Sequence, residues 1–76
     1  MRDILREHMR RDDARLRRQR LAAALSQSEL AARSGVNIRN IQQYEQRAKD
    51  INRAAAISLQ SLARALGCRI EELLES

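Results

Sequence analysis

Residues 26–46, SQSELAARSGVNIRNIQQYEQ, contain two helix starts on either side of one glycine stop. Ser26 followed three residues later by Glu29 forms a capping box, in which each side chain satisfies a free backbone N–H group at a helix start. Gly35 can adopt the left-handed backbone that ends many helices, and Asn37 is a favourable N-cap for the next one. The stretch therefore predicts two short helices, at 27–34 and 38–46, joined by a tight turn.

The rest of the 76-residue chain is also suited to helix. It has no proline, two glycines and a single aromatic residue, and such a composition favours helix over sheet. An N-cap at Asp12 or Asp13 predicts a helix over 14–25. A cap at Asn52 predicts another over 53–66, with Ile57, Leu59, Leu62, Ala63 and Leu66 facing inward. Gly67 is expected to end that helix, and residues 70–76 predict a last one. We therefore expect an all-α fold, a compact bundle of five or six short helices.

Residues 1–14 form a basic N-terminal extension that precedes a domain at 15–76. The first 20 residues hold eight arginines against four acids. Asp3 is a candidate N-cap, and Ile4, Leu5 and Met9 would form an apolar strip along a short helix. Because such a strip should not face water, we expect the extension to be helical and packed, either extending the next helix or contacting a second subunit.

Composition and charge narrow the classes of function. The net charge of +5 indicates an anionic partner, either nucleic acid or a lipid surface. No apolar run approaches the ~20 residues of a membrane span, no signal peptide is visible, and one cysteine is typical of a reducing cytoplasm. His8 has no second ligand at metal spacing, Cys68 suits a small buried position, and no serine has a histidine partner. We expect no enzyme activity, metal or cofactor.

The two helices of the motif are expected to cross closely, because Ala31 is small and Val36 plugs the turn. Ile41 and Tyr44 close the crossing from the other side. Positions 38, 39, 40, 42, 43 and 46 then remain outside the core, with a guanidinium and several amides among them. These groups pair bidentately with guanine and adenine edges in a major groove, so the face suits reading of bases.

The segment LSQSELAARSGVNIRNIQQYE, with LARALGCRIEELL at 62–74, resembles the phage-repressor and Cro type of bacterial helix-turn-helix proteins, the Xre-like family. The resemblance covers about 15–74 and implies a lambda-repressor-like domain whose second motif helix enters the major groove. It implies an anchoring amide at Gln27, base contacts from Ile38, Arg39 and Gln43, and phosphate contacts from Asn40, Arg47 and Lys49. Asn37, Gln42 and Tyr44 complete the expected DNA-contacting set.

The resemblance also implies a structural ion pair between Arg20 and Glu45, with a pair of surface charges as the alternative. Ile38 suits either the core or a thymine methyl group, and the Tyr44 hydroxyl suits either water or a phosphate. The chain departs from the family pattern at Arg47, where glycine is usual, and at Gln19, where an apolar residue is usual.

These observations favour a cytoplasmic, sequence-specific transcription regulator, a repressor that binds double-stranded DNA as a homodimer on a two-fold site. One alternative is an antitoxin-like or adaptor protein that binds a protein partner through its first and last helices. Another is nonspecific binding of RNA or DNA by the arginine-rich N-terminus.

Overall fold

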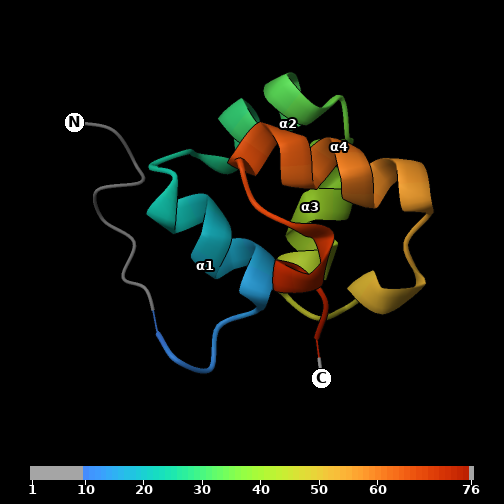
Figure 1. Ribbon diagram of the computed structural model, residues 1–76. Coiled ribbons are helices and arrows are strands. Elements are labelled where there is room, and N and C mark those ends of the chain that lie inside the picture. The colour runs from blue at the N-terminus through green and yellow to red at the C-terminus, as the bar shows by residue number, and fades with distance from the viewer. Residues whose placement is uncertain (1–9, 76) are drawn as a thin grey trace.

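The computed structural model describes residues 10–75, which form four α-helices and two short 3-10 turns (Figure 1). The elements are α1 (Arg15–Ala22), α2 (Gln27–Ser34), α3 (Ile38–Glu45), η2 (Ile51–Arg53), α4 (Ala56–Leu66) and η3 (Ile70–Glu72). No strand occurs between residues 10 and 75, and the all-α class is confirmed. The predicted features at 1–9, including Asp3, the apolar strip and His8, lie outside the described residues.

The core forms between the four helices, where α2 packs against both α3 and α4 and α1 packs against α3. Figure 1 shows α3 near the centre of the molecule, with α1 on one side and α2 and α4 above it. The four α-helices, η2 and the connecting segments contribute aliphatic side chains to a single apolar cluster. The buried members are Leu16, Leu25, Leu30, Val36, Ile41, Ile51, Leu59, Leu62, Ala63 and Leu73.

The local signals at the start of the motif helices act as the sequence predicts. The Glu29 N–H donates to Ser26 Oγ at 3.0 Å, and the Ser26 N–H donates to Glu29 Oε1 at 2.9 Å, so the capping box is confirmed. The Asn37 side chain accepts from the Arg39 N–H at 2.7 Å and caps α3. These caps satisfy amide groups that would otherwise lack partners, and they define where both helices begin.

The predicted cap of the first helix is wrong. α1 begins at Arg15 without a side-chain cap from Asp12 or Asp13. The Asp13 carboxylate instead accepts from the Arg10 N–H at 2.8 Å, and this hydrogen bond, with the Arg17 guanidinium nearby, lowers the pKa of Asp13. Residues 11–13 therefore form a turn, which separates α1 from the preceding residues and prevents one continuous helix.

The C-terminal segment provides the missing cap. Glu75 Oε2 accepts from the Arg15 N–H at 2.7 Å, so a carboxylate 60 positions away occupies the place of a local cap. Asn52 was predicted to cap α4, which is also wrong, because α4 begins at Ala56, four residues after Asn52. The Asn52 amide instead holds the backbone of Glu75 through two hydrogen bonds of 2.7 and 2.8 Å.

Two further expectations about the C-terminal half need correction. Ile57 was expected inside but is 73% exposed, because it lies two residues before buried Leu59 and so on the opposite side of α4. The expected last helix at 70–76 is a single 3-10 turn, η3, followed by the buried side chain of Leu73. The helix count therefore falls to four among the described residues.

Each of the four α-helices between residues 10 and 75 is followed, within two residues of its last position, by a residue with left-handed backbone. Gly35 and Gly67 were predicted as helix stops and have φ of +74° and +68°. The other two are Ala24, after α1, and Arg47, after α3, with φ of +57° and +58°. At both of these the next N–H bonds back across the helix end, from Leu25 to Arg20 and from Ala48 to Gln43, which is the Schellman arrangement.

Replacing Ala24 with glycine should stabilise the domain. The left-handed conformation costs a residue with a β-carbon about 1–2 kcal/mol, and the greater entropy of glycine in the unfolded chain offsets part of the gain. We expect Ala24→Gly to raise the free energy of unfolding by about 0.5–1 kcal/mol. The measurement is urea unfolding followed by circular dichroism. Ala23→Gly is the matched control: at φ −84° it has no strain to relieve and should be neutral or destabilising. Equal effects of both substitutions would contradict the explanation.

Candidate nucleic-acid interface

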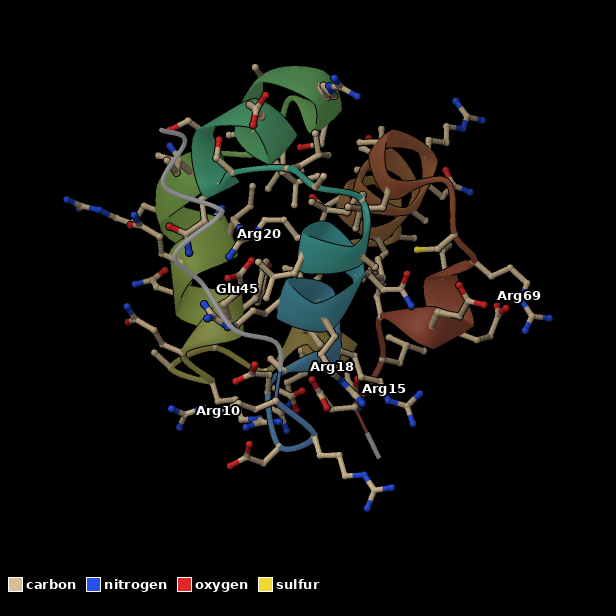
Figure 2. All side chains as sticks on the ribbon, turned by 90° about the vertical axis from the view of Figure 1, so that its left-hand side faces the viewer. Arg10, Arg15, Arg18, Arg20, Glu45 and Arg69 are labelled. Carbon is tan, nitrogen blue, oxygen red and sulfur yellow. The ribbon has the colours of Figure 1, made fainter. Side chains whose placement is uncertain are left out.

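A buried ion pair connects α1 to the C-terminal end of α3. Arg20 Nε lies 2.7 Å from Glu45 Oε2, and a second guanidinium nitrogen lies 2.8 Å from Glu45 Oε1. The two side chains are 0% and 3% exposed, and Figure 2 shows them between the two helices. The third guanidinium nitrogen donates to the Leu25 carbonyl at 2.9 Å. The pair is therefore a bidentate, desolvated contact rather than an exchange of surface charges.

This pair fixes the position of α3 more than it adds stability. Burying both charges costs desolvation energy that their mutual attraction largely offsets, whereas separating them leaves a buried charge unpaired. A guanidinium and a carboxylate also meet in one plane, so the bidentate contact restricts how α3 can rotate or slide. The contact on the inner side of α3 consequently fixes the orientation of its exposed side.

The network continues through Gln27 to the outer edge of α3. Gln27 Nε2 donates to Glu45 Oε1 at 3.2 Å, and Gln42 Nε2 donates to Gln27 Oε1 at 3.4 Å. Gln27 was predicted as the anchoring amide for DNA, and in the structure it also joins the start of α2 to α3. An amide nitrogen has two N–H groups, so one remains for a phosphate oxygen.

The outward sector of α3 carries the side chains best placed to reach bases. At 100° per residue, Arg39 and Gln43 lie on the side of the helix opposite buried Ile41. Gln46, at the helix end, lies seven positions after Arg39 and shares this sector. The sequence placed it on the outward face, but it was not among the residues named as DNA contacts. Ile38 lies at the edge, 36% exposed, so the structure places it at the surface rather than in the core.

Asn40 and Lys49 meet at one flank of this sector. Lys49 Nζ donates to Asn40 Oδ1 at 3.0 Å, which draws the exposed loop after α3 back toward the helix. Both residues were expected at phosphates, and the structure brings them together, with the lysine ammonium exposed. Asn37, another expected contact, uses its side-chain oxygen to cap α3.

Arg47 and Tyr44 lie on a different side of the helix end. The Arg47 guanidinium is 54% exposed and lies 3.9 Å from the Glu75 carboxylate. Tyr44 packs partly against the core and lines, with Arg47 and Lys49, a recess of about 470 Å³. These two residues are therefore outside the sector of Arg39 and Gln43. They would contact DNA only where its sugar–phosphate backbone passes the loop after α3.

Among residues 10–75, the other side chains with reactive or metal-binding groups form no further candidate site. Burial, helped by the nearby Glu72 charge, raises the pKa of the half-buried Cys68 thiol and so disfavours the reactive thiolate. Between residues 10 and 75, no cluster of three or more potential metal ligands occurs. In the same range, no helix is long and apolar enough to cross a bilayer.

A double-mutant cycle on Arg20 and Glu45 tests the role of the pair. Either Arg20→Met or Glu45→Met should lower the free energy of unfolding by about 3 kcal/mol, because each leaves a buried charge unpaired. The double variant should be more stable than either single variant in urea unfolding. Arg69→Met is the control: it breaks an exposed 3.7 Å pair with Glu72 and should cost less than about 1 kcal/mol. A coupling below about 0.3 kcal/mol would show that Arg20 and Glu45 act independently.

Comparison with known proteins gives one match. A family model described as helix-turn-helix matches residues 16–73, which is more than half of the chain and extends from the second residue of α1 to beyond α4. Searches of curated proteins and of solved structures found no significant match. The family is the one that the residues between Ser26 and Glu45 resemble, and the order and spacing of α2 and α3 agree with it. The chain belongs to the helix-turn-helix family of the Xre and lambda-repressor type, and is a DNA-binding transcription regulator.

Proposed function

We propose that this chain is a sequence-specific regulator that inserts α3 into the major groove, where Arg39 and Gln43 read base edges. The observation that carries the proposal is the contrast between the two sides of α3. Its inner side is fixed by the buried Arg20–Glu45 pair, and its outer side presents a guanidinium and an amide one turn apart. A rigid helix that offers these two groups suits guanine and adenine, which accept bidentate contacts from them.

Phosphate contacts would come from residues around the reading sector. Lys49 and the free N–H of Gln27 lie at two flanks of α3, and Arg47 lies at its C-terminal end. Such contacts position a protein on the duplex without carrying sequence information. Arg47 would exchange its 3.9 Å contact with Glu75 for a contact with a phosphate. The Lys49 ammonium would contact a phosphate while it still donates to Asn40.

The proposal includes a homodimer that acts as a cytoplasmic repressor and has no enzymatic activity. A single short helix reaches only a few base pairs, whereas two copies on a two-fold site double the sequence that is read. Dimers of this motif place recognition helices roughly 34–36 Å apart, on half-sites about one helical turn from each other. Repression would follow from occupation of such a site.

The first test is selection of bound sequences from a random duplex pool with the full chain. The proposal expects an enriched motif in the form of an inverted repeat, with half-sites about 10 base pairs apart. Recovery of sequences without any shared motif would show that the chain binds DNA nonspecifically.

Two substitutions separate base reading from phosphate contact. Arg39→Ala should weaken binding to the selected site by about 1–3 kcal/mol and relax the preference at one guanine. Lys49→Ala should weaken binding to all duplexes alike and reduce the slope of log affinity against log salt concentration by about 1. Both are measured by fluorescence anisotropy on the selected and single-base variant duplexes, with Arg64→Ala, at an exposed position of α4, as control. A uniform loss with Arg39→Ala would make Arg39 a phosphate contact.

The oligomeric state is tested by sedimentation equilibrium in the presence and absence of the selected duplex. One chain has a mass of 8.7 kDa, and we expect two chains per inverted repeat. A half-site duplex should bind one chain and with much lower affinity. Equal affinities for the half-site and the full site would show that the two copies bind independently and form no functional dimer.

A further inference from the structure

A recess on the far side of α1 contains positive charge that DNA recognition does not use. Arg15, Arg18, Gln19 and Ala22 form one stripe along α1, and with Glu72 of η3 they line a recess of about 340 Å³. Figure 2 shows Arg15 and Arg18 close together on α1, with Arg69 beyond them next to η3. The volume suits one or two side chains rather than a nucleic-acid duplex.

The recess faces away from the reading helix. At 100° per residue, the centre of the stripe lies roughly 150° around α1 from Arg20, which points to Glu45 on α3. Each side of α1 thus has a different role, one being fixed to α3 and the other open to solvent. DNA held by Arg39 and Gln43 would leave the recess unoccupied.

Arg18 is the residue that points to a ligand. Its Nε atom is buried and has no hydrogen-bond partner among residues 10–75. A buried N–H without a partner is uncommon in native proteins, because the lost hydration is not replaced. Neither Arg15 nor Arg18 forms a side-chain ion pair within that range, in contrast to Arg17, which lies next to Asp13. Two guanidinium groups are therefore available at one recess.

The charges around the recess indicate an acidic ligand. Arg69 lies 3.7 Å from Glu72 and offsets its negative charge, so Arg15 and Arg18 determine the net sign. A carboxylate is planar and matches the fork of N–H groups on arginine, so it suits the guanidinium groups that line the recess. A single carboxylate side chain also fits a recess of this size, whereas the phosphates of a duplex require an extended surface.

We propose that the recess between α1 and η3 binds an acidic segment of a partner protein, with an aspartate or glutamate side chain on Arg18 and Arg15. The chain would then contact DNA through α3 and an acidic protein surface through α1 at the same time. The proposal is independent of which DNA sequence α3 reads.

The test is an NMR titration of the full chain, which observes backbone amides and arginine Nε–H groups. The probe is a short peptide of alternating glutamate and alanine, and the same peptide with glutamine is the control. We expect saturable shifts at the Arg15 and Arg18 Nε–H groups and at the backbone of α1 and η3, with none from the glutamine peptide. Prior addition of the selected duplex should leave these shifts unchanged.

Substitutions give the second part of the test. Arg18→Gln should weaken the peptide affinity by roughly tenfold, the value of one charge-assisted hydrogen bond. Arg64→Gln, at an exposed position of α4, should leave it unchanged. If the Arg18 variant has an altered circular dichroism spectrum, Arg15→Gln takes its place in the same titration and should also weaken the peptide affinity. Shifts spread evenly over all arginines would overturn the proposal in favour of nonspecific charge attraction. Stronger perturbation of Arg15 and Arg18 by duplex DNA than by the peptide would assign the recess to DNA.

Discussion

The bidentate contact between Arg20 and Glu45 is the constraint on which the placement of α3 depends. Both side chains are buried, so neither can leave the other without stranding a charge in the core. The same contact engages the Leu25 carbonyl and Gln27, which joins the end of α1 and the start of α2 to α3. A domain with one aromatic residue thus obtains a rigid reading helix through a polar contact of defined geometry.

Backbone conformation at the helix ends controls how closely the helices can follow one another. Four left-handed residues reverse the chain, and Ala24 and Arg47 do so despite their β-carbons. The family resemblance implies glycine at the position of Arg47, and the left-handed φ of +58° there accounts for that preference. The arginine accepts backbone strain there, and it places a cation at the loop next to α3 and near Glu75.

Glu75 shows how the end of the chain completes the domain. Its side chain caps α1 and lies near Arg47, and its backbone is held by Asn52. Three segments that are far apart in sequence therefore meet at one residue. The two sides of α1 consequently have separate roles: one holds α3 through Arg20, and the other presents Arg15 and Arg18 at an open recess beside η3.

The sequence alone determined the features that depend on neighbours within about four residues. Ser26 with Glu29, Gly35, Asn37 and Gly67 define helix ends through local hydrogen bonds and backbone preference, and periodicity indicated Ile41 and Leu62 as core. The outward position of Arg39 and Gln43 follows from the same period. The Arg20–Glu45 pair came from family resemblance, since no local rule joins positions 25 apart. Tertiary structure alone decided the cap of α1, the role of Asn52, the exposure of Ile57 and the recess at Arg18, because each depends on which distant segment packs against a residue.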